Sequence, residues 1–449
     1  MKTSSQLLHR PISQVTLGDL STSTQAIWIT VLVIVKLLLI GVTGATIGSE
    51  QSVTLSLSLD LIFLTVGFLY SRTLTVTYLF TSTLCMSLYL SYHFESGAKF
   101  TAGADDQIYY DNFLILINSA NFSDGYNSLL RTDLTSMLLA LASVPFRVLG
   151  IEFKSPIDFF LLQASCLAPL GPLIHKLSMK MYGRKVSILY FFAFTPYWYF
   201  GVVGREWPLY YLAIVVTLLF SSNNRVIVYI ISFFVFVYLA SLVRFEAILI
   251  FGLFVLFHIR NKLSVLAIVV VASISMLSVS DYISGVLQFA TEKSRLIYFS
   301  QIEQSTGLGG ALKYSENMLV KPFFILYLIF SPIPPYFFHE RTLENFILLT
   351  GHLFWPLLVF AIGFRLRKFI CILIGSVGIL SAVVGFSSVI LLMAFYGGTN
   401  RHYYPFVPHL LLILPMMFSM HRSLVHSLKR PFFALASLGV FYMGLSVIL

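Results

Sequence analysis

Apolar runs long enough to cross a bilayer recur along this chain from residue 26 to residue 449. A helix needs about 20 mostly apolar residues to span the hydrocarbon core of a membrane. The first run, "AIWITVLVIVKLLLIGVTGATIG", is too long for the apolar region of a signal peptide and predicts a retained anchor. Backbone polar groups must be satisfied internally in lipid. The pattern therefore predicts an all-α fold, a polytopic transmembrane helix bundle of about 12 to 14 spans.

The composition agrees with this prediction. The chain is 57% hydrophobic and 11% charged, whereas soluble domains carry roughly a quarter charged residues. Its net charge of +10 does not indicate nucleic acid, because the Lys and Arg residues lie in short clusters between apolar runs. The three cysteines lie inside apolar segments and show neither disulfide nor metal spacing. No nucleoside-triphosphate loop is present, so direct use of ATP is not expected.

Basic clusters orient the predicted bundle, because Lys and Arg accumulate on the cytoplasmic side of membrane proteins. The clusters are "KLSMKMYGRK" (176–185), "HIRNK" (258–262), "RLRK" (365–368) and "HRSLVHSLKR" (421–430). Alternation from these anchors gives a cytoplasmic tail over 1–25 and a single membrane domain over 26–449. In a bacterium, this is a multi-pass protein of the inner (plasma) membrane. Five polar segments then lie on the outer face: 93–132, 204–206, 243–246, 281–318 and 397–403.

Some apolar runs carry features unusual for a span. The run 133–149 contains Pro145 and the run 319–338 contains "SPIPP". The run 133–149 is predicted to lie in the interface or to re-enter. The run 319–338 is predicted to face protein or a cavity, or to re-enter, because proline removes a backbone donor that lipid cannot replace. The run 369–396 is predicted to be one span. Lys36 and Asp60 are the main ionisable residues within spans, where they could pair with one another.

The two long outer loops, 93–132 and 281–318, mix charges with apolar residues at helical spacing and predict interfacial helices. In the first loop an apolar stripe follows three aspartates, Asp105, Asp106 and Asp111. The stripe consists of Ile108, Phe113, Leu114, Leu116 and Ile117. Acids at a helix N-terminus are favoured by the helix dipole, so helix capping alone would account for part of this acidic cluster.

Charged residues also stand at the ends of three later spans. They are Arg205 and Glu206, Arg244 and Glu246, and Arg401 and His402. A charge in the membrane is costly and marks a functional site or an internal pair. A carboxylate near several arginines suits an enzyme in which the carboxylate is a general base and the guanidinium groups hold a phosphate. Tyr109, Tyr110 and Tyr403 could stack on a sugar, although an interfacial aromatic belt is the simpler reading.

These stretches resemble the GT-C superfamily of polytopic membrane glycosyltransferases, in the bacterial branch of protein mannosyltransferases and aminoarabinose transferases. The resemblance rests on "GADDQIYYDNFLILI", "GREWPLYYLA", "LVRFEAILIF" and "NRHYYPFVPHLLLI". It implies that Asp105 and Asp106 serve as general base and acceptor-positioning residues. It also implies that Arg244 and Arg401 are candidates for binding a lipid phosphate. The chain departs from the family in having three apolar spans before the acidic loop where one is usual.

The sequence thus predicts transfer of a sugar from a polyprenyl-phosphate-linked donor to a glycan or lipid-linked acceptor, at the outer face and in envelope polysaccharide synthesis. Arg205, Arg244 and Arg401 would balance the charge that builds on the leaving phosphate. Paired carboxylates beside a phosphate also suit Mg²⁺ or Mn²⁺, although nothing in the sequence requires a metal. No nucleic-acid partner is expected.

Three alternatives stay open at this point. A polysaccharide polymerase of the O-antigen or capsule type also acts on lipid-linked sugars and fits the long loop 281–318. A flippase or transporter of lipid-linked oligosaccharide fits the number of helices. Ion-driven transporters, however, usually place acids near the middle of the membrane, and such acids are scarce here. The last alternative is a membrane scaffold without chemistry.

Overall fold

The computed structural model describes residues 22–47, 60–61, 65, 71–96, 104–130, 133–153, 156–182, 206–220, 226–243, 247–259, 265, 268, 270, 358–359, 361–396, 405–413 and 417. Within these ranges the regular structure is helical and contains no strand. The predicted all-α class is therefore confirmed for this part of the chain.

Thirteen helices are bounded in the described part of the chain. They are α1 (Thr22–Ile47), α3 (Arg72–Ser96), α4 (Ala104–Asn118), α5 (Phe122–Asn127), α6 (Leu134–Val148), α7 (Pro156–Leu167), α8 (Leu170–Tyr182), α11 (Trp207–Phe220), α12 (Val226–Val243), α13 (Ala247–His258), α19 (Leu366–Gly375), α20 (Val377–Tyr396) and α21 (Val407–Leu411).

Few of these helices pass a strict test for a membrane span. Among the described residues, one helical stretch, Thr73–Leu90, is both long and apolar enough. A second qualifies if α19 and the first part of α20 are counted together across their break. Four shorter apolar helices, Ala26–Gly41, Leu134–Val148, Trp207–Phe220 and Ile227–Val243, fall below the length limit. The full polytopic arrangement therefore stays a prediction.

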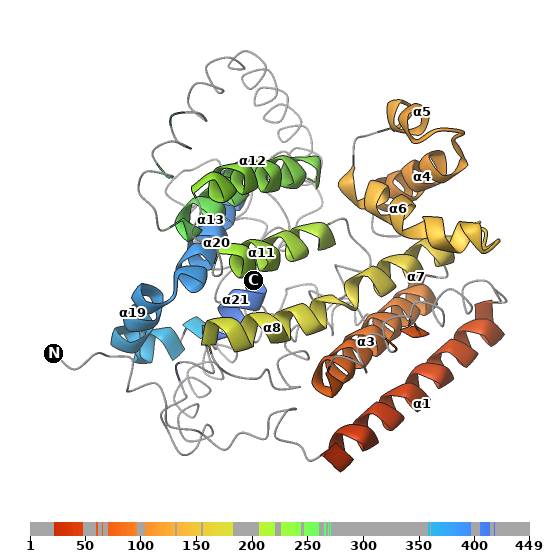
Figure 1. Ribbon diagram of the computed structural model, residues 1–449, viewed down its shortest axis with the longest axis horizontal. Helices are drawn as coiled ribbons and strands as arrows, with labels where there is room; N and C mark the ends of the chain where they lie inside the picture. The colour runs from red at the N-terminus through yellow and green to blue at the C-terminus, as the bar shows by residue number, and fades with distance from the viewer. Residues whose placement is uncertain are drawn as a thin grey trace, which may run out of the picture.

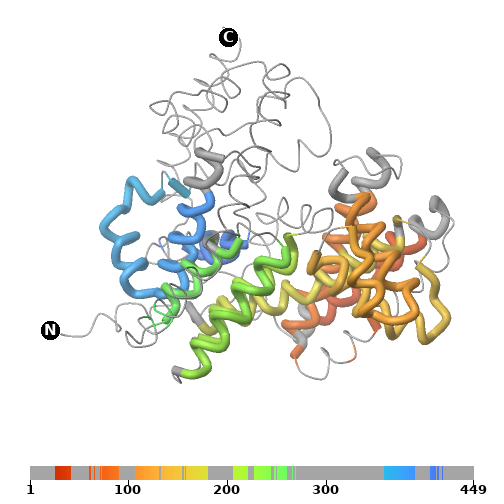
Figure 2. Tube along the Cα trace, turned by 90° about the horizontal axis from the view of Figure 1, so that it is seen from above, coloured from red at the N-terminus to blue at the C-terminus, as the bar shows by residue number. Residues whose placement is uncertain are grey.

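The described helices form a continuous chain of packed neighbours. Helix α1 packs on α3, and α3 packs on both α7 and α8. Helix α8 then contacts α11, which packs with α12 and α13, and α13 packs along α20. Figures 1 and 2 show α1 and α3 at one side of the molecule and α13, α19 and α20 at the other. The core between them is rich in aromatic rings, with Phe159, Phe251, Phe254 and Phe406 almost completely buried.

Helix α4 is held in place by α6. Asp133 caps the N-terminus of α6 by accepting hydrogen bonds from the backbone N–H groups of Thr135 (3.1 Å) and Ser136 (2.9 Å). The Ser136 hydroxyl donates to the backbone oxygen of Tyr109 in α4 (2.9 Å). The side-chain oxygen of Asn112 accepts from the backbone N–H of Leu130 (3.0 Å), which ties the chain after α5 back to α4.

Helix α4 confirms the helix predicted within residues 93–132, and of the five residues in its predicted apolar stripe three are buried and two, Ile108 and Leu114, are partly buried. Phe113, Leu116 and Ile117 are buried, because α4 turns these residues toward α6 and α7. Phe113 lies edge-on to Phe153, with ring centroids 5.6 Å apart. The stripe therefore faces protein rather than the membrane surface.

The run predicted to be one span, 369–396, is in fact broken. Helix α19 ends at Gly375 and α20 begins at Val377, and the two helices are bent by 109°. Ser376 causes the break by adopting an extended conformation (φ −133°, ψ 102°). Its backbone oxygen and hydroxyl then accept hydrogen bonds from Leu380 and Ile379 in the first turn of α20. A serine in this position provides the cap that a new helix needs.

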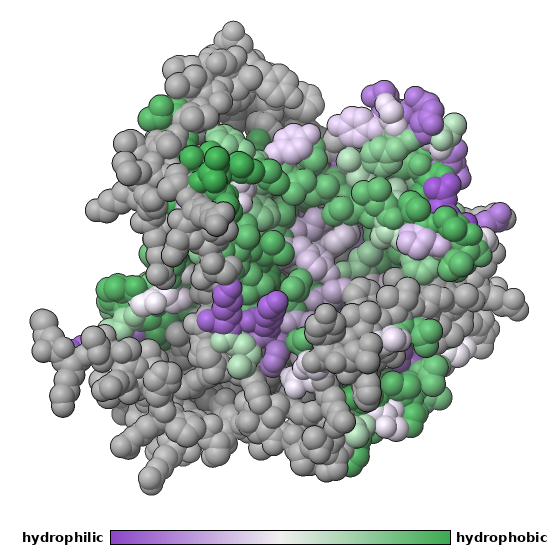
Figure 3. All heavy atoms as spheres, viewed as in Figure 1, coloured by the Kyte–Doolittle hydropathy of each residue, from purple (hydrophilic) through white to green (hydrophobic). Residues whose placement is uncertain are grey.

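Apolar side chains cover much of the described surface, as Figure 3 shows on one face. On α1, Ile27 and Leu38 are exposed by more than half. On α12, Ile227, Ile231 and Tyr238 are equally exposed. Extended apolar surfaces of this kind mark contacts with a membrane or with another protein.

Candidate functional site

The acidic turn predicted to carry the catalytic base begins helix α4. Asp105 and Asp106 lie in the first turn of this helix, while their side chains lie outside the described residues. Asp111, one to two turns further on, is partly exposed and accepts a hydrogen bond from the amide of Gln107 (2.8 Å). The two candidate bases therefore belong to the first turn of a helix that packs on α6.

Tyr109 and Tyr110 are buried rather than displayed. Their exposed fractions are 3% and 6%, and Tyr110 lies edge-on to Phe159 with ring centroids 5.8 Å apart. Burial raises the pKa of the Tyr110 hydroxyl, and the carboxylates of Asp158 and Asp111 raise it further. Tyr110 therefore stays protonated at neutral pH and is not a candidate base. The structure gives both rings a packing role, and sugar stacking by them stays a prediction.

Glu206 occupies a buried position immediately before α11. Its side chain is fully buried, and its backbone oxygen accepts from Leu209 (2.9 Å) in the first turn of the helix. The neighbouring Trp207 lies edge-on to Tyr211, with ring centroids 5.8 Å apart. The Tyr211 hydroxyl in turn donates to the backbone oxygen of Cys166 at the end of α7. Arg205, which adjoins Glu206, lies outside the described residues.

The other two sets of charged residues predicted at the ends of spans lie close in sequence to buried residues. Arg244 and Glu246 lie outside the described residues, between the buried ends of α12 and α13. Arg401, His402 and Tyr403 also lie outside them and shortly precede Phe406. Phe406 is completely buried. Its ring contacts Phe251 and Phe254 of α13, at centroid distances of 5.6 and 5.1 Å.

Helices α11 and α13 meet near their C-terminal ends, and α21 joins them there. Thr217 of α11 and His258 of α13 meet at 2.9 Å, and His409 of α21 reaches the same Thr217 hydroxyl at 2.8 Å. Phe406, three residues before His409, lies against Phe251. The starts of α11 and α13 therefore lie toward the other end of the bundle, whereas the five-residue helix α21 lies beside the C-terminal part of both helices. Because only three residues separate Val243 from Ala247, the C-terminus of α12 lies at the end where α13 starts.

Helices α4 and α6 lie near the end where α11 and α13 start. The Tyr211 hydroxyl of α11 donates a hydrogen bond to the backbone oxygen of Cys166 in α7. Two turns later in α11, the backbone oxygen of Leu218 accepts a hydrogen bond from the Lys180 ammonium group of α8 (3.2 Å). Helices α7 and α8 therefore run parallel to α11, and the earlier part of α7 extends past the start of α11. Helix α6 contacts α7, α11 and α12, and α4 packs on α6. Figure 1 shows α4 and α6 beside one end of the α11–α12 pair, away from α19.

Basic residues occupy the opposite end of the bundle. Lys180 bonds near the C-terminus of α11. The guanidinium group of Arg365 donates to the backbone oxygen of Met417 (3.0 Å), and the Lys368 ammonium group reaches the same oxygen. These residues belong to two of the basic clusters predicted to be cytoplasmic. Within the described residues, the buried Glu206 and helix α4 thus lie toward one end of the bundle. Lys180, Arg365 and Lys368 lie toward the other end.

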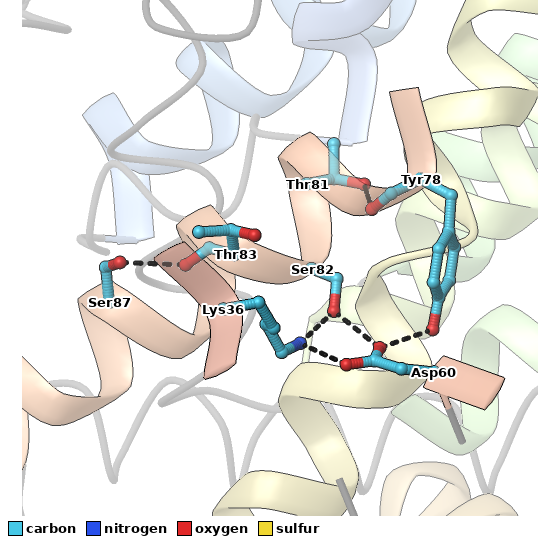
Figure 4. A network of polar contacts seen from close by, with 7 residues as sticks. All are labelled: Lys36, Asp60, Tyr78, Thr81, Ser82, Thr83 and Ser87. Atoms are coloured by element: carbon cyan, nitrogen blue, oxygen red, sulfur yellow. Dashed lines mark hydrogen bonds and ion pairs between the residues drawn. The ribbon is translucent and has the colours of Figure 1, made fainter. Parts of the chain in front are cut away.

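The predicted pairing of Lys36 with Asp60 is confirmed. The Lys36 ammonium group lies 2.9 Å from Oδ2 of Asp60, and both side chains are almost completely buried. Figure 4 shows the Ser82 hydroxyl between them and the Tyr78 hydroxyl on the other side of the carboxylate. Ser82 and Tyr78 donate to Oδ1 of Asp60 at 3.0 and 3.1 Å. The carboxylate is thus neutralised by one cation and held by two hydroxyl groups.

A second buried polar cluster is not anticipated from the sequence. Thr217, His258 and His409 lie among the rings of Phe220 and Phe254. Nδ1 of His258 lies 2.9 Å from the backbone oxygen of Phe254, which can only accept. With neutral rings, His258 therefore accepts the Thr217 proton at Nε2, and His409 donates from Nε2 to the Thr217 oxygen. The only signal in the sequence is two histidines in apolar surroundings.

Among the described residues, no group of three or more His, Cys, Asp or Glu side chains lies close enough to hold a metal ion. A comparison of the chain with protein families, with characterised proteins and with solved structures found no match.

Proposed function

We propose that this chain is a polytopic membrane glycosyltransferase that uses a polyprenyl-phosphate-linked sugar at the outer face of the membrane. One observation carries the proposal: helix α4, which begins with the acidic turn, lies near the same end of the bundle as the starts of α11 and α13. Arg205 and Arg244 shortly precede these two starts in the sequence, and Arg401 shortly precedes Phe406, whose ring packs on α13. The proposal assigns these candidate bases and candidate phosphate ligands, which are far apart in sequence, to one region.

The proposed reaction is a displacement at the anomeric carbon of the donor sugar. Asp105 or Asp106 takes the proton of an acceptor hydroxyl as its oxygen bonds to that carbon. The bond from the carbon to the phosphate oxygen breaks, and the polyprenyl phosphate leaves with the electron pair. Arg205, Arg244 and Arg401 stabilise the charge on the leaving phosphate. Glu206 and Glu246 would orient the arginines, while His402 and Tyr403 would contact the substrate.

The membrane setting of this proposal has its own support. The exposed apolar faces of α1 and α12 suit lipid acyl chains. The basic residues Lys180, Arg365 and Lys368 gather at the other end of the bundle, as the positive-inside rule predicts for a cytoplasmic side. With that orientation, the acidic turn of α4 faces the outer side of the inner membrane.

The test is glycan production in a strain that lacks the gene and is complemented with variants at matched membrane levels. Asp105→Asn or Asp106→Asn should lower product formation by roughly 10²- to 10⁴-fold, the usual effect of losing a general base, while the lipid-linked donor accumulates. Asp111→Asn is the matched control, because Asp111 lies on the same helix and bonds only Gln107 among the contacts described here. It should support normal glycan levels.

Arginine variants test the phosphate role separately. Arg401→Ala and Arg244→Ala should abolish product, and Arg→Lys at either position should restore it only in part, because lysine lacks the planar fork of donors. If both aspartate variants make normal glycan while Arg401→Ala makes none, the acidic turn is only a helix cap. A polymerase or a flippase would then replace the transferase.

A further inference from the structure

Helix α19 exposes an apolar face that belongs to no part of the proposed catalytic region. Leu366, Ile370 and Ile374 are exposed by 55%, 45% and 80%. They follow one another at intervals of four residues and so form one stripe along the helix. Ile372, with its partly buried neighbours Phe369 and Leu373, packs on the opposite side against the core.

The exposed part of α19 divides into two sectors. At about 100° per residue, Leu366, Ile370 and Ile374 share one arc, and Arg367 and Cys371 share the next arc around the helix. Arg367 and Cys371 are also exposed. The helix therefore has three sides: one against protein, one apolar and one polar with a positive charge. This distribution is typical of a helix that lies in a membrane interface.

The orientation of α19 agrees with such a position. Within the described residues, α20 meets the criterion for a span only together with α19. Of the two helices, α20 is the one whose 20 apolar residues match the thickness of a bilayer, and most of its described residues are buried or partly buried. Because α19 is bent by 109° from α20, it is nearly perpendicular to the direction in which α20 would cross. Arg365 and Lys368 fix it there by bonding the backbone oxygen of Met417.

We propose that α19 lies flat in the cytoplasmic interface of the membrane and binds anionic lipid. Leu366, Ile370 and Ile374 enter the acyl chains, while Arg367 meets the phosphates of the headgroups, which favour Arg as a partner. Three cations in the stretch 365–368 make this short helix complementary to an anionic surface and unsuited to the hydrocarbon core. The inference rests on the membrane setting of the proposed function but not on its chemistry.

The chain carries its own probe for this proposal. Of its three cysteines, Cys85 is buried, Cys166 is partly buried and Cys371 is exposed on the polar sector of α19. The experiment measures the rate at which a membrane-impermeant maleimide labels the full-length protein in inside-out vesicles. Cys371→Ser gives the background from the other two thiols. In that background, single cysteines replace Leu366, Arg367, Ile370 or Ile374.

The in-plane arrangement gives an alternating pattern of rates. Native Cys371 and Arg367→Cys should label fast, and Leu366→Cys, Ile370→Cys and Ile374→Cys should label on the order of tenfold slower or more, because apolar surroundings suppress the thiolate. Raising the fraction of anionic lipid in reconstituted vesicles should slow the three apolar positions further. The neighbouring pair Leu366→Cys and Arg367→Cys is the sharpest contrast.

Three outcomes would overturn the proposal. A steady fall in rate from position 366 to position 374 would make α19 part of a span. Fast labelling at all five positions would place the helix in water. Protection that disappears on dilution of the protein in lipid would assign the stripe to a second copy of the chain. Ser387→Cys, at an exposed position in α20, separates the two proposals: fast labelling there would contradict the membrane setting itself.

Discussion

The ammonium group of Lys36 in α1 lies 2.9 Å from the carboxylate of Asp60, and the Ser82 hydroxyl of α3 contacts both. This contact joins α1 to α3 at a buried point, beside the small apolar cluster of Leu32, Val76 and Leu79. Removing two charges from water is costly, and their attraction offsets that cost only while both are present. This ion pair therefore affects the stability of the protein most when only one of its two partners is removed.

Removing either partner of this pair should destabilise the protein more than removing both. Lys36→Met or Asp60→Leu alone should cost roughly 3–5 kcal/mol, because each leaves an uncompensated buried charge. The double variant should recover most of that loss. Thermal unfolding in detergent, followed with a thiol-reactive dye in a Cys371→Ser background that lacks the exposed thiol, reports the change because Cys85 in α3 is buried in the folded state.

The control for this series is Thr30→Ala. The Thr30 hydroxyl is exposed and bonds only the backbone of Ala26 within α1, so its loss should change stability by no more than about 0.5 kcal/mol. A double variant as unstable as the worse single variant would contradict the ion-pair account. It would show that the losses come from packing.

Thr217 should hold two histidines in the core. Thr217→Val keeps the shape of the side chain and removes the hydroxyl group that hydrogen-bonds both His258 and His409. The loss should be roughly 1–3 kcal/mol, the usual cost of leaving a buried polar group without its partner. Thr217→Ser keeps the hydroxyl and should lose less than half as much. If Thr217→Val were as stable as the wild type in a thermal unfolding assay while Thr217→Ser lost stability, the packing of the methyl group and not the hydroxyl would decide the effect.

Local patterns predicted the parts of this structure that depend on neighbouring residues. The helix over 104–118 follows from the spacing of Phe113, Leu116 and Ile117, which share one face at helical periodicity. The pairing of Lys36 with Asp60 was predictable because isolated charges in apolar runs have few possible partners. The same periodicity places Tyr109 and Tyr110 beside Phe113, and this explains why the structure buries both rings.

Other features could not be read from a single sequence. The bend at Ser376 interrupts an apolar run that contains no proline, and a glycine followed by a serine is common within spanning helices. The contact between Thr217 and His409 joins residues 192 positions apart, and no local period encodes such a distance. The relative directions of α11 and α13 likewise have no local signal in the sequence.

A close approach between α3 and α8 should make Gly171 intolerant of a side chain. A Cβ atom at Gly171 would lie 2.6 Å from Cγ2 of Thr81 and 2.9 Å from the backbone oxygen of Thr77. The backbone oxygen cannot move without distorting α3. Gly171→Ala should therefore cost roughly 1–3 kcal/mol in thermal unfolding, as overpacking usually does.

The control for this substitution is Gly252→Ala in α13. A Cβ atom there would meet nothing within 4 Å, and alanine favours a helix over glycine by roughly 0.5–1 kcal/mol. This variant should be as stable as the wild type or more so. If Gly171→Ala were equally stable, α3 and α8 would not pack as closely as the structure places them.

The cap at Asp133 should connect stability with activity, because α6 supports the helix that carries the proposed base. Asp133→Ala removes the acceptor for the N–H groups of Thr135 and Ser136 and should cost roughly 0.5–2 kcal/mol. The start of α6 would loosen, and with it the bond from Ser136 to Tyr109. Glycan formation should fall, and Asp133→Asn, which keeps a side-chain acceptor, should restore most of it.

Ser143→Ala, which removes only a bond within α6 to Ala140, should leave glycan formation normal. If Asp133→Ala lowered stability but left glycan formation at the wild-type level, the position of α4 would not limit the reaction, and the base would have to lie elsewhere.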